Sequence, residues 1–137
     1  MPANFPSVLL IALGGAAGTL LRYWGTLALA RWSQSFPWST ILINAGGSFA
    51  IAFFAGLTAP DGRIPAPDAA RLFFMVGVCG GFTTFSSFSL QTLDLLRSGF
   101  PLRALLNILL SVALCMATVS AGWFASVALS ADRNNIH

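Results

Sequence analysis

The hydrophobic positions of this chain fall into four long runs, which short polar segments separate. The runs cover approximately residues 8–30, 38–58, 71–96 and 101–129, and the segments between them read RWSQSFP, APDGRIPAPDAA and RSGFP. A helix needs about 20 mostly apolar residues to cross a bilayer. All seven prolines lie outside the centres of the runs, as expected where helices end. The pattern predicts an all-α integral membrane protein with a single four-helix domain at residues 1–129, followed by a polar tail at 130–137.

Small and polar residues recur at helical spacing within three of the runs. Residues three or four positions apart lie on one face of a helix. The three stripes are Gly14, Gly18, Arg22 and Thr26; Thr40, Asn44 and Ser48; and Asn107, Ser111, Cys115, Thr118 and Gly122. Such a face serves either close helix packing or a polar pathway through the protein. We favour packing for Gly14 and Gly18 and leave both uses open for Asn44 and Ser111.

The third run contains the segment GGFTTFSSFS at residues 80–89. Gly80 and Gly81 weaken a helix, and the hydroxyl groups that follow can satisfy freed backbone groups. Non-helical backbone in a membrane is tolerated where protein buries it or where it lines a cavity, and there it often marks an ion site. We therefore expect the third helix to break near its middle, at Gly80–Gly81, and to offer carbonyls to a hard cation. The alternative is a helix that is merely kinked.

Charge is scarce in this chain and evenly divided. Charged residues make up 8% of the sequence, hydrophobic residues 56%, and every basic residue is an arginine. Because the arginines are scattered singly and form no basic face, we exclude nucleic-acid binding. Three arginines fall on each side of the predicted membrane: Arg63, Arg71 and Arg133 with the termini, and Arg31, Arg97 and Arg103 opposite. Since arginine bias sets orientation, this balance predicts insertion in both orientations and antiparallel pairing of two copies.

Several other classes of protein fit poorly. The sequence shows no paired nucleophile and base and no soluble domain, so we do not expect an enzyme. Cys79 and Cys115 lie in apolar runs without metal-ligand spacing and are interpreted as small buried side chains. A small dual-topology multidrug exporter needs a carboxylate within the membrane, but the chain has no Glu, and Asp94 lies near the end of a run. A non-transporting membrane assembly subunit would leave the mid-membrane Asn44 without a role.

Three motifs occur in order, one in each of the first three runs: GGAAGTLLRY at 14–23, NAGGSF at 44–49 and GVCGGFTTFSSFS at 77–89. Together, in a four-span chain of this length, they resemble the Fluc/CrcB family of fluoride channels. The resemblance implies an antiparallel, dual-topology homodimer with two pores in the bacterial cytoplasmic (inner) membrane. It also implies passive fluoride export, which protects the cell against fluoride toxicity.

The resemblance further implies roles for individual residues. Fluoride would contact Asn44 and, by extension, Thr40 on the second run, Phe82 and Phe85 on the third, and Ser111 on the fourth. The alignment of the fourth run is loose, so Asn107 or Cys115 can take the place of Ser111.

The resemblance also implies a structural Na⁺ on the two-fold axis, held by the backbone carbonyls of Gly77 and Gly80 from both copies. We interpret Arg22 as a tie to backbone carbonyls or a group that reaches the lipid surface, and less favourably as an anion attractor at a pore entrance. Gln91 stands where family members often carry Glu.

Overall fold

The computed structural model describes residues 5–134, whose regular elements are all helical. Four spans, Phe5–Ala28, Trp38–Leu57, Asp68–Arg97 and Pro101–Ala131, are long and apolar enough to cross a membrane, as the sequence predicted. Several elements build them. They are α1 (Phe5–Ala28), the 3₁₀ turn η1 (Ala30–Ser33), α2 (Trp38–Leu57), α3 (Asp68–Arg71), the π-helix η2 (Leu72–Cys79), α4 (Gly80–Phe82), α5 (Phe85–Arg97) and α6 (Pro101–Asn134).

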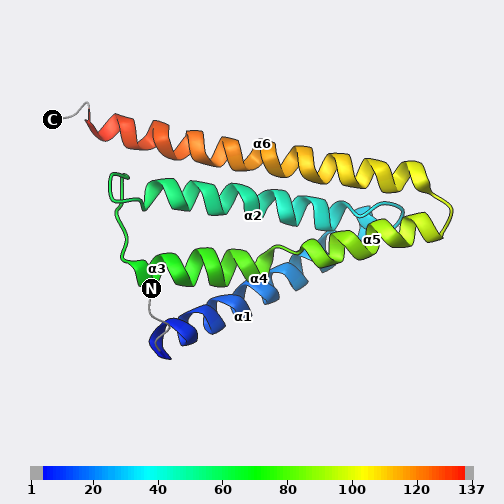
Figure 1. Ribbon diagram of the computed structural model, residues 1–137, viewed down its shortest axis with the longest axis horizontal. Helices are drawn as coiled ribbons and strands as arrows, with labels where there is room; N and C mark the ends of the chain where they lie inside the picture. The colour runs from blue at the N-terminus through cyan, green and yellow to red at the C-terminus, as the bar shows by residue number, and fades with distance from the viewer. Residues whose placement is uncertain (1–4, 135–137) are drawn as a thin grey trace.

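The four spans alternate in direction, so α1 begins at the end of the bundle where α6 finishes (Figure 1). The longest contact joins α2 to α6, which run side by side, while α1 packs obliquely on η2 and α4. α5 lies against the first half of α6. The two most extensive contacts therefore join non-neighbouring spans, while the smaller contact of α5 with α6 joins the third span to the fourth.

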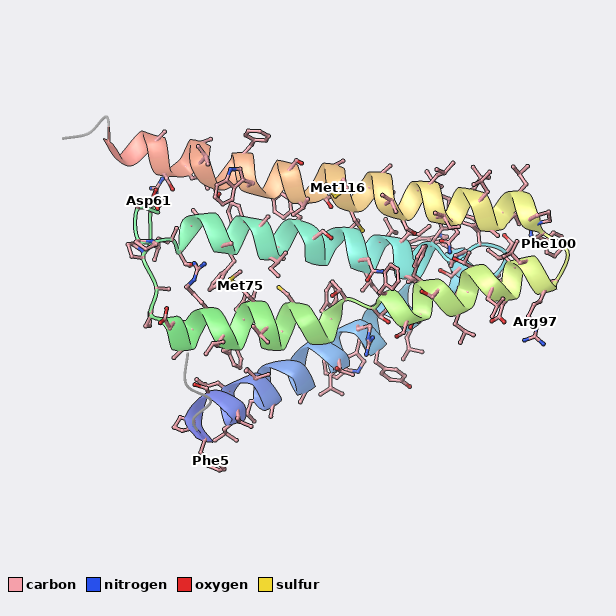
Figure 2. The ribbon with its side chains drawn as sticks, in the orientation of Figure 1. Phe5, Asp61, Met75, Arg97, Phe100 and Met116 are labelled. Carbon is pink, nitrogen blue, oxygen red and sulfur yellow. The ribbon has the colours of Figure 1, made fainter. Side chains whose placement is uncertain are left out.

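Apolar side chains point outward around the whole bundle (Figure 2). Phe5 is 81% exposed and Met116 is 61% exposed, and most leucines of α1 and α6 are exposed as well. By contrast, the buried residues include many hydroxyl and amide side chains. This arrangement suits a bilayer, in which lipid covers the apolar exterior and polar groups turn towards protein.

Glycines bring α1 onto the third span, backbone against backbone. A β-carbon on Gly14 would collide with the carbonyl oxygen of Phe73, and one on Gly18 would collide with that of Val78. From the other side, a β-carbon on Gly81 would strike the carbonyl of Gly15. The packing predicted for Gly14 and Gly18 is confirmed.

The polar stripe of the fourth span faces α2 in its second half. The hydroxyl of Thr118 donates to the carbonyl of Ala45 at 2.8 Å. One turn later, a β-carbon on Gly122 would collide with the carbonyl of Phe49. Small residues thus let α6 approach α2 closely, as they do between helices in other membrane proteins.

The third helix is broken, but not at the glycines. Gly80 is helical, with φ −64° and ψ −37°, and it begins α4. The extended residues are Thr83 (ψ 157°) and Thr84 (φ −152°, ψ 107°). Our placement of the break at Gly80–Gly81 was wrong, because Gly81 serves close packing on α1 and leaves the helix intact.

A tight turn returns the chain from α5 to α6. Gly99 has φ 81°, the one positive φ among the described residues. Its N–H donates to the carbonyl of Leu96 at 3.1 Å, and the N–H of Phe100 donates to that of Leu95 at 2.9 Å. These two bonds form a Schellman motif, which ends a helix sharply and usually requires glycine at this position.

Candidate ion pathway

Asn44 holds the break in the third helix by pairing with the backbone of Thr84. The side-chain nitrogen of Asn44 donates to the carbonyl of Thr84 at 3.1 Å, and the N–H of Thr84 donates to the side-chain oxygen of Asn44 at 2.7 Å. The two bonds fix which way the amide points. An amide nitrogen carries two hydrogens, so one N–H of Asn44 remains for a ligand.

The hydroxyl groups after the glycines form hydrogen bonds with backbone groups around the break in the third helix. The side chain of Thr83 donates to the carbonyl of Cys79 at 2.9 Å. The hydroxyl oxygen of Thr84 accepts the N–H of Ser87 at 3.2 Å, and so caps the N-terminus of α5. The expectation that hydroxyls satisfy freed backbone groups is confirmed for these residues.

Three cavities follow one another from the η1 end of the bundle to the break. We name them the outer cavity (about 310 Å³), the middle cavity (about 270 Å³) and the inner cavity (about 300 Å³). Gln91 lines both the outer and the middle cavity, and Thr84 lines both the middle and the inner cavity. The shared residues place the three cavities in a row from the surface to Asn44, and we call this row the track.

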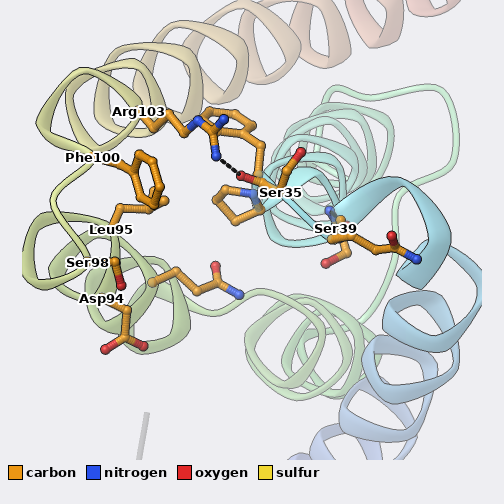
Figure 3. A pocket seen from close by; sticks show the side chains of 12 residues that line it. Ser35, Ser39, Asp94, Leu95, Ser98, Phe100 and Arg103 are labelled. Carbon is orange, nitrogen blue, oxygen red and sulfur yellow. Dashed lines mark hydrogen bonds between the residues drawn. The ribbon is translucent and has the colours of Figure 1, made fainter.

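The outer cavity lies where η1, the end of α5 and the start of α6 meet (Figure 3). Asp94 and Arg103 stand on opposite sides of it. The guanidinium group of Arg103 donates to the carbonyl of Ser35 at 3.4 Å and lies 4.6 Å from the ring centroid of Phe100. The positively charged side chain of Arg103 is thereby held in place at the outer end of the track.

The middle cavity brings Arg22 and Thr40 together. Both residues line it, as does the hydroxyl-bearing Ser87. The guanidinium group of Arg22 makes no hydrogen bond to the described residues 5–134, so the expected tie to backbone carbonyls is not made within one copy. Its charge instead borders the middle cavity.

Gln91 presents an unsatisfied group between the outer and middle cavities. Its side-chain oxygen is buried and has no hydrogen-bond partner within the described part of the chain. A buried polar atom without a partner costs about 1–3 kcal/mol, so a ligand or water that pairs with it is favoured. The amide supplies either an acceptor or N–H donors there, depending on its orientation.

The break separates the two predicted pore phenylalanines. Phe85 is 77% exposed and lines the inner cavity with Asn44. Its ring centroid lies 5.2 Å from that of Phe88, which is buried. Phe82 precedes the break and packs near Gly47, where its Cδ1 atom would lie 3.2 Å from an added β-carbon. Phe82 is absent from the lining of the inner cavity.

Ser111 belongs to a buried hydrogen-bond network. Its hydroxyl donates to the side-chain oxygen of Asn107 at 3.4 Å, and the Asn107 nitrogen donates to Thr92 at 2.8 Å. Asn107 and Ser111 are 1% and 6% exposed. Neither lines the inner cavity, whereas Cys115, one turn further along α6, does. Of the three candidates on this stripe, only Cys115 lines the cavity that Asn44 lines.

Gly77 and Gly80 have different surroundings. A β-carbon on Gly77 would lie 2.8 Å from the Cα atom of Gly14, and the Gly77 carbonyl accepts the N–H of Gly80. Gly80 is exposed, and a β-carbon there would meet nothing within 4 Å. In a continuous helix its carbonyl would pair with the N–H of Thr84, which donates to Asn44 instead. A hard cation prefers oxygen ligands, so Gly80 suits the expected sodium site better than Gly77 does.

Comparison with known families agrees with this geometry. Residues 9–123 match the model of a family described as CrcB-like protein, Camphor Resistance (CrcB). The chain belongs to the CrcB family. It is similar to the fluoride-specific ion channel FluC of Paramagnetospirillum magneticum, with 53% identity over 122 residues that cover 88% of this chain and 95% of the relative. The protein of the same name in Methylobacterium radiotolerans is 50% identical over 119 residues, which cover 87% and 83% of the two chains.

CrcB membership agrees with the resemblance found in the sequence, and with its four spans the chain is a multi-pass membrane protein. Some contacts of this CrcB chain were missed from sequence alone. Phe88 was not singled out, although its spacing of three from Phe85 places both rings on one face of α5. Thr84 was noted only as one of several hydroxyls, because its pairing with Asn44 joins residues forty positions apart.

Proposed function

We propose that this chain forms a fluoride-selective channel that lets fluoride leave the cell passively, and so protects against fluoride toxicity. Curated relatives that are about half identical to it carry the name of a fluoride-specific ion channel. The observation that carries the proposal is the amide of Asn44. It is fixed by Thr84 at the break and lines a cavity in the middle of the span.

The lining of the track suits a small anion that holds its water tightly. A pore must replace this water without binding the ion so strongly that it cannot leave. The free N–H of Asn44 is a neutral donor. The hydroxyls of Thr83 and Thr84 are also neutral, but their hydrogens bond to Cys79 and Ser87, so they can donate to an ion only after rotating. The edge of the Phe85 ring carries partial positive charge and attracts an anion without offering a full charge to trap it.

Two arginines lie near the track before that point, and the carboxylate of Asp94 stands opposite the first of them in the outer cavity. Arg103 stands at the outer cavity and Arg22 at the middle one, both before the inner cavity with Asn44. Charged side chains thus lie on the approach, and neutral donors line the inner cavity. This order raises the local concentration of anions without creating a deep binding site at the break.

Two antiparallel copies would complete the pathway, in keeping with the even arginine balance. Phe85 and Gly80 are exposed within one chain although they lie at mid-membrane, so a second copy is the natural cover for them. Opposed copies would bring two broken helices together at the two-fold axis. We place the chain in the bacterial inner membrane, where export from the cytoplasm takes place.

A sodium ion on that axis would be held by backbone carbonyls at the break. The last carbonyls of α4 lose their helical partners there, and Gly80 is the exposed member of the two residues expected as ligands. Bound sodium would supply positive charge that neutralises these carbonyls and ties the two copies together. The role of Gly77 would instead be structural, since it packs on α1.

Ion flux from purified, full-length protein in liposomes tests the proposed function. We expect rapid release of fluoride and no measurable release of chloride from the same vesicles. Equal passage of both anions would contradict selectivity, and no passage of either would contradict channel function. Export of cationic drugs in these vesicles would instead support the multidrug-exporter class, which the family comparison does not favour.

A further inference from the structure

The third span contains a π-helix, η2, whose turns are wider than those of an α-helix. The backbone of its eight residues, Leu72–Cys79, is paired five positions apart, whereas an α-helix is paired four apart. π-Helices rarely exceed a single turn and are frequent at functional sites. The effect of these wide turns is seen where η2 packs on α1.

Along this contact, η2 uses five residues where α1 uses four. A β-carbon on Gly14 would collide with the carbonyl of Phe73. One on Gly18, four residues further along α1, would collide with the carbonyl of Val78, which is five residues beyond Phe73. The third span therefore holds one surplus residue between these two contacts, and the wide turns of the π-helix accommodate it.

Contacts with α2 hold the third span on both sides of the surplus residue. Before it, the guanidinium group of Arg71 donates to the carbonyl of Ala55 at 3.1 Å. After it, the backbone of Thr84 makes two hydrogen bonds with the side chain of Asn44. The surplus residue cannot be shifted towards either end of the span unless one of these contacts is broken.

An α-helix in place of η2 would turn other residues towards α1. In an α-helix, the residues three and four positions after Phe73 would face α1, and these are Val76 and Gly77. Val76 would then stand where Gly77 stands now, and a β-carbon at that place would lie 2.8 Å from the Cα atom of Gly14. The segment that follows would also be turned by one residue, about 100°, away from its present contacts with α2.

We propose that η2 is a positioning segment of the ion pathway. Its surplus residue turns Gly77 and Gly81 towards α1 and leaves Gly80 exposed. It thereby places Thr84 opposite Asn44, where the break lines the inner cavity. The consequence for ions rests on the proposed function, whereas the alignment of η2 with α1 does not.

Two single-residue deletions test this alignment, and each is the control for the other. Deletion of Val76, which is exposed, gives the segment LFFMGVCGGF, and deletion of Val78 gives LFFMVGCGGF. The two variants have the same length and composition and differ only in the order of one valine and one glycine. Both lose the surplus residue, so an α-helix can join the two contacts with α1. Only the deletion of Val76 keeps a glycine opposite Gly14.

The protein that lacks Val76 should keep the unfolding temperature and the fluoride flux of the unaltered protein, although one residue of a membrane span is missing. The protein that lacks Val78 should unfold in detergent at a temperature lower by about 5 °C or more. It should also lose most of its fluoride flux in liposomes, because a valine side chain would push α1 away from the third span. Equal losses in the two variants, or no loss in either, would overturn the positioning role.

Rescue by a second substitution separates alignment from a general effect of shortening. Val76→Gly in the protein that lacks Val78 restores a glycine opposite Gly14, and it should recover both the unfolding temperature and the flux. Val76→Gly in the full-length chain is the control and should leave flux unchanged. Recovery of stability without flux would contradict the positioning role. If the unaltered protein passes no fluoride, the proposed function fails, while the unfolding temperatures still decide how η2 aligns with α1.

Discussion

Under the proposed function, Asn44 combines a structural and a chemical role in one amide. Its oxygen and one N–H replace helix bonds that the third span lacks at Thr84, and the other N–H is left for an ion. A side chain held on both sides does not reorient when an ion arrives, so its donor stays directed at the cavity. Preorganised donors of this kind replace lost water without a further cost in entropy.

Replacing this amide should separate its two roles. Asn44→Asp keeps an acceptor for the N–H of Thr84 but removes both N–H donors and adds a negative charge. We expect fluoride flux to fall at least about tenfold, because an anion is repelled in a medium of low dielectric. Asn44→Ala should also lower the free energy of unfolding by about 1–3 kcal/mol through the unpaired backbone of Thr84. Ser120→Ala, which removes an exposed hydroxyl on α6, is the control for both liposome flux and denaturant unfolding.

Substitution of the two phenylalanines on either side of the break tests their predicted pore roles separately. Phe85→Ile removes a ring edge that lines the inner cavity and should cut fluoride flux by about tenfold or more, while the protein remains folded. The predicted pore role of Phe82 requires a similar loss in Phe82→Ile. Normal flux in Phe82→Ile, with the dimer intact by size exclusion, would assign that ring to packing against Gly47.

At the scale of elements, the close approach of α1 to the third span depends on glycines on one face only. A β-carbon on Gly14 would collide with the backbone of Phe73, whereas one on Gly15 would meet nothing within 4 Å. These neighbours differ in what they face and not in helical propensity. They therefore form a matched pair for measuring how much the packing contributes.

We expect Gly14→Ala to lower the free energy of unfolding by about 1–3 kcal/mol, because two backbones would have to move apart. Gly15→Ala should be neutral or stabilise the helix by about 0.5–1 kcal/mol, since alanine loses less entropy than glycine. Thermal unfolding in detergent, compared for the two variants and the unaltered protein, measures the difference. Equal effects would mean that the contact of α1 with η2 is not tight in solution.

The sequence predicted the spans to within a few residues, because a bilayer demands long apolar runs that are easily recognised. It misplaced the break, since glycines that weaken a helix also allow close packing, and only the partner helix decides between these uses. The position of the break depends on Asn44, which is remote in sequence. On the fourth span, Ser111 and Cys115 share a stripe, and only the neighbours of α6 determine that Cys115 lines the inner cavity. The pore role of Ser111 stays a prediction.

At the scale of the whole molecule, the proposed pathway is incomplete within one chain. Exposed Phe85 and Gly80 leave the centre of the proposed pathway uncovered on one side. The sodium ion that we propose for the axis would draw carbonyls from both copies, so its binding should be coupled to pairing. A ligand that binds only the paired state stabilises that state in proportion to its concentration.

Removal of sodium should therefore weaken the pair. When N-methylglucamine replaces sodium in the buffer, we expect the dimer to dissociate at lower temperature and fluoride flux to fall. Size exclusion after heating, repeated across a series of sodium concentrations, measures the shift. If the stability of the dimer does not depend on sodium, the proposed sodium site at the break is wrong.

The pairing of non-neighbouring spans also constrains how the chain is made. α1 packs mainly on η2 and α4, and α2 packs mainly on α6. During synthesis, α1 and α2 therefore enter the membrane before either partner exists, and α2 must wait for the last helix to emerge. A nascent chain that stops before residue 101 can form only one of the two pairs. Packing of the bundle is consequently completed only after the first two spans have entered the membrane.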